Sequence, residues 1–262
     1  MSASIAMAVA TNDSLSFTGL PKKEGDRWIP LESDPDIMND CIKWAKQLGL
    51  ETDKYTFQDV YGLDPELLAL VPQPVKAILL LFPNVQAVED ARNADEAKRD
   101  PSHKDPIDPN VIFIKQTISN ACGTIALLHA LANASDITIS PSSPLQHFIA
   151  LCKEKSPEER AELLEDTELF AKMHKAAAEA GRSVITPDLD TDLHFICFVQ
   201  AKSQSDPTGK RLIELDGRRT APVDYGSSSD ILADVAKVAQ EKYLNSTNSL
   251  QFSMTALAPT DF

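Results

Sequence analysis

The sequence lacks long hydrophobic runs, paired cysteines and an excess of positive charge. The longest apolar run, residues 77–82, is too short to span a membrane, and the N-terminus has no secretory signal, so we expect a cytoplasmic protein. The four cysteines (Cys41, Cys122, Cys152 and Cys197) include no CxxC pair, which argues against a zinc site and a disulfide framework. This pattern favours a reducing, intracellular setting, and we expect no metal or other cofactor.

The composition is acidic and otherwise ordinary for a globular protein. The 262 residues carry a formal net charge of −14, with 43% hydrophobic and 24% charged residues. An acidic surface repels phosphate backbones and anionic lipids, so we expect neither nucleic acid nor a membrane as partner. The same surface attracts a basic protein or peptide, although solubility alone also accounts for acidity. No repeat or second domain is visible, and we expect a monomer.

Apolar periods, prolines and turn residues divide the chain into a tail and one folded domain. Residues 1–25 are rich in Ser, Ala and Asn without a period, which predicts a disordered tail before a domain of residues 26–262. Helices are predicted over residues 33–49, 64–70, 123–132, 144–152 and 156–170, and strands over 56–61, 75–82 and 111–114. We expect residues 86–110 to form a polar, partly disordered surface excursion, and residues 172–192, which lose the period, to be functional or mobile.

The turn before the predicted helix 123–132 carries the groups of an acyl-transfer site. With Ser119 or Asn120 as N-cap, Cys122 lies in the first helical turn. There, free backbone N–H groups and the helix dipole favour a thiolate. Gln116, six residues earlier, brings an amide that can donate hydrogen bonds. A lone cysteine in an apolar helix is more often a packing residue, so catalysis depends on a base and an acid elsewhere.

A predicted hairpin brings such a base and acid together. Residues 193–199 and 211–216 form its strands, and a hairpin centred on Ser205 pairs His194 directly with Asp216 on one face. A one-residue slip would place them on opposite faces. Separately, His194 reads as a strand-end histidine and Asp216 as a turn residue. Together with the cysteine they favour a catalytic triad.

The other histidines and one further cysteine are poorer candidates for the chemistry. His129 lies in the helix of the cysteine itself, and His103 and His174 lie in polar segments. His147 and Cys152 lie in a half-buried helix, where a structural role is expected.

Five sequence blocks resemble those of one enzyme family, the ubiquitin C-terminal hydrolases. Three of them contain the candidate residues: QTISNACGT (116–124), LHF (193–195) and ELDG (214–217). Two more, WIPLE (28–32) and DVYGLDPELL (59–68), resemble the short cytosolic members. The resemblance extends from about residue 28 to residue 258, nearly the whole chain.

The resemblance implies a role for each candidate and a fold. Cys122 would be the nucleophile, His194 the general base and then acid, and Asp216 the residue that orients His194. The Gln116 side chain and the Cys122 N–H would form the oxyanion hole. The implied fold is a papain-like α/β (α+β) cysteine protease fold, with a central, mostly antiparallel sheet flanked by helices. Its backbone is knotted, and a crossover loop at about residues 172–191 lies over the active site.

The implied substrate is ubiquitin, or a ubiquitin-like protein, that carries a small adduct or short peptide on its C-terminal glycine. Its basic tail would complement the acidic chain. Residues 1–25 have no counterpart in the short members, and the 201–210 turn is longer than usual but lies away from His194. No long extension follows Phe262, which argues against the proteasome-docking branch. A ubiquitin reservoir with negligible turnover and an unrelated thiol acyltransferase are the alternatives.

Overall fold

A six-stranded antiparallel sheet forms the centre of the protein, as expected. The computed structural model describes residues 28–33, 36–39, 50–51, 54–98, 107–135, 137–180, 191–206 and 208–260. The strand order is β2 (Tyr55–Asp59), β8 (Ser253–Pro259), β3 (Ala77–Pro83), β5 (Leu193–Lys202), β6 (Lys210–Leu215) and β7 (Val223–Ser227). A small separate sheet pairs β1 (Leu50–Glu51) with β4 (Thr138–Ile139). The knotted connection stays a prediction.

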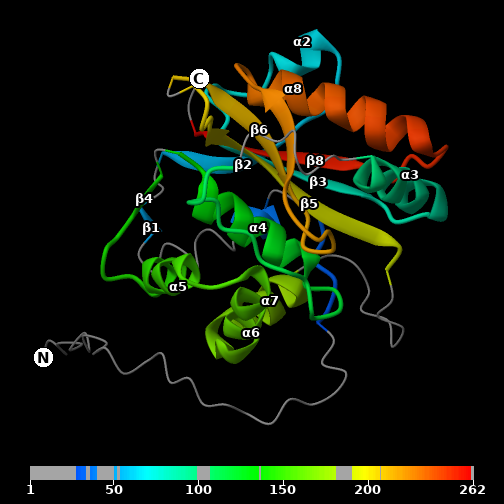
Figure 1. The fold of residues 1–262 in the computed structure, drawn as a ribbon. Coiled ribbons are helices and arrows are strands. Elements are labelled where there is room, and N and C mark those ends of the chain that lie inside the picture. The colour runs from blue at the N-terminus through cyan, green and yellow to red at the C-terminus, as the bar shows by residue number, and fades with distance from the viewer. Residues whose placement is uncertain are drawn as a thin grey trace, which may run out of the picture.

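Helices cover both faces of the sheet (Figure 1). One face carries α4 (Cys122–Asn133), α5 (Pro144–Lys153), α6 (Pro157–Asp166) and α7 (Glu168–Ala180). The other carries α2 (Pro65–Leu68), α3 (Gln86–Ala97) and α8 (Ile231–Val238), which continues into a π turn (Ala239–Tyr243) and a 3-10 turn (Leu244–Ser246). In the described part of the chain, no helix is long and apolar enough to cross a membrane.

The protein has one hydrophobic core on each side of the sheet, and strand β3 contributes to both because its side chains alternate between the two faces. Leu79 and Leu81 pack with the helices around α4, whereas Ile78, Leu80 and Phe82 pack with those around α8. All seven residues of β3 are buried. The strand predicted over residues 75–82 is therefore confirmed, and burial on both faces is typical of a central strand.

Several other predicted elements are confirmed, and some lie outside the described residues. The predicted elements near residues 56–61, 64–70, 123–132 and 144–152 correspond to β2, α2, α4 and α5. Helix α6 begins with the capping box that Ser156 and Glu159 predict. Of the predicted helix 33–49, residues 36–39 are described and helical. Ser33 is described and is not helical. Residues 34–35 and 40–49 with Cys41, the tail 1–25, His103 and residues 181–190 lie outside the described part.

Three predictions about loops and helix ends are wrong. Residues 86–97 form α3 rather than an excursion, because Val88 and Arg92, one helical turn apart, bury the inner face of the helix. The predicted helix 156–170 breaks at Thr167, whose hydroxyl donates to the Leu163 carbonyl at 2.6 Å as α6 ends. Helix α7 then continues to Ala180, well inside the segment predicted to be a crossover loop.

The segment 111–114, buried from Ile112 to Ile114, belongs to no sheet, so the predicted strand is also wrong. Its backbone groups bond mostly to side chains of α4 instead, and the Phe113 carbonyl accepts from Arg160 Nη1 of α6 at 3.0 Å. The Ile112 N–H donates to Asn133 Oδ1 at 2.7 Å, and Asn133 Nδ2 donates to the Ile112 carbonyl at 2.9 Å. The Ile114 N–H donates to His129 Nε2 at 2.9 Å. The apolar composition predicted burial correctly. Buried backbone groups need hydrogen-bond partners, however, and here side chains on helices supply them in place of a neighbouring strand.

We expect Asn133→Ala to lower the free energy of unfolding by about 2–4 kcal/mol, because it leaves the Ile112 N–H and carbonyl without partners. Urea denaturation monitored by circular dichroism measures this change. Asn110→Ala is the matched control, because the Asn110 side chain bonds Asp108 at an exposed site. A loss for Asn133→Ala no larger than that of the control would contradict this account.

Candidate active site

Cys122 is the first residue of α4, so the prediction that it lies in the first helical turn is confirmed. The predicted cap is wrong, because Ala121 occupies the N-cap position and no side chain caps the helix. Asn120 instead has a positive φ of 63° and donates from Nδ2 to the Trp28 carbonyl at 3.0 Å. Asparagine tolerates this left-handed conformation better than most residues. The Asn120 side chain thereby links the turn before Cys122 to the N-terminal segment of the described domain.

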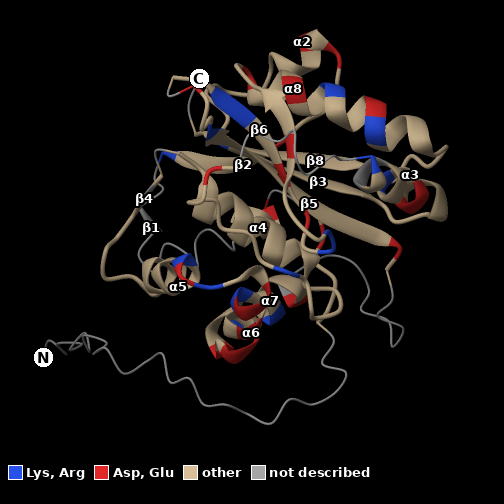
Figure 2. Ribbon diagram, in the orientation of Figure 1, with Lys and Arg blue, Asp and Glu red and all other residues tan. Residues whose placement is uncertain are grey.

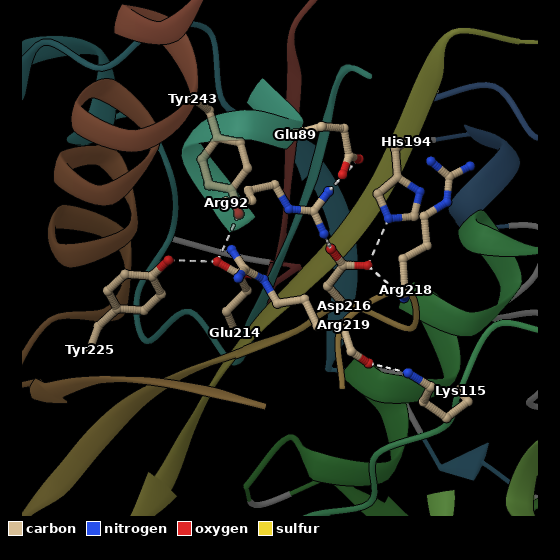
Figure 3. Close-up of polar contacts among 10 residues, drawn as sticks. All are labelled: Glu89, Arg92, Lys115, His194, Glu214, Asp216, Arg218, Arg219, Tyr225 and Tyr243. Carbon is tan, nitrogen blue, oxygen red and sulfur yellow. Dashed lines mark hydrogen bonds and ion pairs between the residues drawn. The ribbon is translucent and has the colours of Figure 1, made fainter. Parts of the chain in front are cut away.

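The structure brings His194 and Asp216 into direct contact. His194 Nε2 lies 2.7 Å from Asp216 Oδ1, and both side chains are fully buried (Figure 3). The predicted register is nevertheless wrong by two residues, because Cys197 pairs with Leu215 and Asp216 follows the last paired position. A shift of two keeps both side chains on one face, since the side-chain period of a strand is two. The two side chains therefore meet diagonally rather than directly across the hairpin.

Cys122 and His194 influence each other's ionisation in opposite directions. Burial raises the pKa of the Cys122 thiol, but the hydrogen bonding and charge of His194, helped by Arg218, outweigh it and lower the pKa. Burial lowers the pKa of His194, but Asp216 and Cys122 outweigh it and raise the pKa. His194 Nδ1 has no well-aligned partner, as is common in a resting site. The arrangement favours a thiolate beside an imidazolium.

The turn that carries Asp216 is fastened to the segment that carries Gln116. The Gln116 N–H donates to the Gly217 carbonyl at 2.9 Å, and Lys115 Nζ donates to the Arg219 carbonyl (Figure 3). A Cβ on Gly217 would lie 3.0 Å from both Gln116 N and Gln116 Cβ. The two segments approach so closely that any larger residue at position 217 would require one of them to shift by a few tenths of an ångström.

Gln116 also lines a polar cavity of about 260 Å³. The other lining residues are Thr117, Ile118, Ser119, Asn120, Thr191 and Arg218. Gln116 Nε2 donates one hydrogen bond to the Ile118 carbonyl at 3.2 Å, and an amide has a second hydrogen to donate. Arg218, which lines this cavity, also helps to lower the pKa of the Cys122 thiol through its charge. The role of Gln116 in an oxyanion hole stays a prediction.

Two other histidines and two other cysteines lie in buried environments that are unsuited to the chemistry. Burial lowers the pKa of His129 and His174 to about 4. The expectation of a polar segment around His174 is wrong, because α7 buries it between the Thr124 hydroxyl and the Ile29 carbonyl. Burial raises the pKa of Cys152 to about 11 and that of Cys197 well above its ordinary value. Among the described residues, no group of side chains could hold a metal ion.

Sequence analysis missed Arg92, which contacts Asp216 from α3. The segment around it was read as a surface excursion, so nothing placed it near the site. The only sequence signal is its spacing from Glu89, since residues three apart on a helix are neighbours and the two form an ion pair.

We expect Cys122 to react with iodoacetamide at a pH below the ordinary thiol range, about 8.5, because His194 stabilises the thiolate. His194→Gln should raise the midpoint of the rate by about one pH unit or more. Peptide mass spectrometry at graded pH distinguishes Cys122 from the other cysteines. His147→Gln, at an exposed position of α5, is the control. An unchanged midpoint in His194→Gln would rule out the thiolate–imidazolium pair.

Comparisons with known proteins agree with this geometry. The family model described as "Ubiquitin carboxyl-terminal hydrolase, family 1" matches residues 28–244. Ubiquitin carboxyl-terminal hydrolase 3 of Arabidopsis thaliana is 39% identical over 245 residues, covering 92% of this chain and 98% of the relative. The human ubiquitin carboxyl-terminal hydrolase isozyme L1 is 36% identical over 233 residues, covering 87% of this chain and 96% of the relative.

A solved structure shares the fold. The catalytic domain of UCH37 from Trichinella spiralis, crystallised with ubiquitin vinyl methyl ester, superposes with a TM-score of 0.65 at 22% sequence identity. The match covers 89% of this chain and 96% of the solved chain. The expected papain-like α/β fold is thereby confirmed. On the family match and on these relatives, the chain belongs to family 1 of the ubiquitin carboxyl-terminal hydrolases.

Proposed function

We propose that the protein is a deubiquitinating cysteine hydrolase that removes small adducts or short peptides from the C-terminal glycine of ubiquitin. The observation that carries the proposal is the Cys122 thiol of lowered pKa beside a histidine that Asp216 holds at 2.7 Å. Family membership supplies the substrate class, and the relatives named as ubiquitin hydrolases support it. Residues 26–262 would form the single catalytic domain.

In the proposed reaction the chain's own residues perform every step. The Cys122 thiolate attacks the carbonyl carbon of the terminal glycine, and the Cys122 N–H and Gln116 amide stabilise the oxyanion. The imidazolium of His194 then gives its proton to the leaving amine, which departs and leaves a thioester on the sulfur. Neutral His194 next takes a proton from water, which attacks the thioester and releases ubiquitin. Asp216 keeps the imidazole in one orientation throughout.

The proposal also covers the partner of the protein and its cellular setting. Figure 2 shows both acidic and basic residues on α7 and α8, and mostly acidic residues on α6. The net charge of −14 therefore acts as a general attraction for a basic ubiquitin tail, strongest at low salt. We propose that the protein acts as a monomer in the cytoplasm, in ubiquitin-dependent catabolism. A ubiquitin-like protein is a second candidate substrate, and nucleic acids and membranes are not partners.

The direct test is hydrolysis of a fluorogenic amide on the C-terminus of ubiquitin. Wild-type protein should turn it over, and Cys122→Ala should abolish turnover because no nucleophile remains. Gln116→Ala should lower kcat by about 10²–10³-fold, the usual effect of losing one oxyanion donor. Absence of wild-type turnover would reject the proposal. The same assay on a ubiquitin-like modifier compares the two substrates.

A ubiquitin reservoir with negligible turnover is the alternative. The lowered pKa of the Cys122 thiol favours the enzyme, because binding alone needs no thiolate. A ubiquitin vinyl-type probe separates the two, since only an aligned thiolate forms the covalent adduct. Binding of ubiquitin without an adduct at Cys122 would favour the reservoir.

We expect Gly217→Ala to lower kcat/KM by about 10–100-fold, since the new Cβ would displace Gln116 or the Asp216 turn. Gly209→Ala is the matched control, because its Cβ would also make a close contact, but with the Asp206 side chain in the distant hairpin turn. Steady-state kinetics on the ubiquitin amide provide the comparison. Equal effects of the two substitutions would show that the close approach at Gly217 is unimportant.

A further inference from the structure

The two carboxylate oxygens of Asp216 have different partners. Oδ1 accepts from His194 Nε2 at 2.7 Å and from the Arg218 N–H at 2.9 Å. Oδ2 accepts from Nη2 of Arg92 on α3 (Figure 3). Asp216 has no exposed surface, so no water competes for either oxygen. The carboxylate is therefore held from both ends and offers only one oxygen to His194.

Arg92 is itself firmly placed, with only 7% of its surface exposed. Its Nη1 lies 3.2 Å from Glu89 Oε1, one turn earlier on α3. Its guanidinium lies over the Phe82 ring, 5.7 Å from the centroid, and the same ring packs edge-on against His194, with centroids 5.6 Å apart. Phe82 thus separates Arg92 from His194 while Asp216 connects them.

We propose that Arg92 is a positioning residue of the active site, which acts from α3 through the second oxygen of Asp216. This inference rests on the proposed function and goes beyond it, because the triad logic needs no cation on the far side of the carboxylate. A planar guanidinium suits the task because its fork can bond Asp216 and Glu89 at fixed angles. A buried arginine also costs desolvation, which the pairing with two carboxylates offsets.

The charge of Arg92 has a consequence that a purely structural contact lacks. A cation beside Asp216 partly cancels the carboxylate field that favours the protonated form of His194. Removing it makes the site more negative, which disfavours the Cys122 thiolate and favours the imidazolium. The other ionisable groups near the pair are His129 on α4, Glu214 on β6, Arg218 and Arg219 in the following turn, and Tyr243 beyond α8. Arg92 also lowers the pKa of Tyr243, which burial holds well above its ordinary value, so Tyr243 stays neutral with or without Arg92 over the range of the profile. Both limbs of the pH–rate profile should therefore move to higher pH.

The test measures two pH profiles, kcat/KM on the ubiquitin amide and the alkylation rate of Cys122. Arg92→Gln should lower kcat/KM by about 10–100-fold and move both alkylation and kinetic midpoints up by about one pH unit. Arg92→Lys keeps the charge and loses the fork, so kcat should fall while the midpoints stay near the wild-type values. Glu89→Gln removes a neighbouring negative charge, so the midpoints should move down.

The matched control is Arg211→Gln, which loses a 2.6 Å ion pair with Asp224 on the same sheet, away from the site. It should leave both profiles unchanged. A rate loss in Arg92→Gln with unmoved midpoints would overturn the proposal. If Arg92→Gln does not fold, the direction in which Glu89→Gln moves the two pH midpoints decides the question. Midpoints that do not move, or that move up, would overturn the proposal. The alkylation profile needs no turnover, so a failure of the proposed function would be recognised separately.

Discussion

The buried carboxylate of Asp216 is the constraint on which the active site depends. An ionised group with no contact to water is stable only if charged or hydrogen-bonded partners surround it. Its partners come from three parts of the chain: His194 on β5, Arg92 on α3 and the backbone of Arg218 in its own turn. Of these partners only Arg92 lies on a helix, and its contact connects α3 to the turn that follows β6. The need to pair this one buried charge therefore determines how α3 packs on the sheet.

The sheet and α4 determine how the Cys122 thiol is placed next to His194, the residue that contacts the Asp216 carboxylate. Helix α4 packs against β5, so Cys122 at its first residue faces the strand that carries His194. Neighbouring carbonyls of the Asp216 turn bind the 115–116 segment, which leads into the same helix. The parts of the site are thus connected through backbone as well as side chains. Such support keeps catalytic groups within the small tolerance that the chemistry requires.

Local patterns predicted those features that depend on neighbouring residues. The capping box of α6, the apolar run of β3 and the Ala- and Leu-rich α4 fold as their own sequences indicate. Elements that depend on distant partners were missed or misread. Residues 111–114 have the composition of a strand, but α4 binds their backbone. Helix α3 is polar overall. Its few inward side chains, Val88 and Arg92, are buried only because the helix packs beside the sheet, which the local sequence does not indicate.

The sequence by itself determined which residues are the candidates for the chemistry and the face of the hairpin on which two of them lie. Whether His194 and Asp216 lie on the same face depends only on whether the error in the predicted register is even or odd. The prediction of a shared face is therefore correct although the register is wrong by two residues. Only the tertiary structure decided the diagonal contact of His194 with Asp216 and the presence of Arg92 behind it. Residues far apart in the chain meet because of packing and charge burial, and no local period encodes which of them will do so.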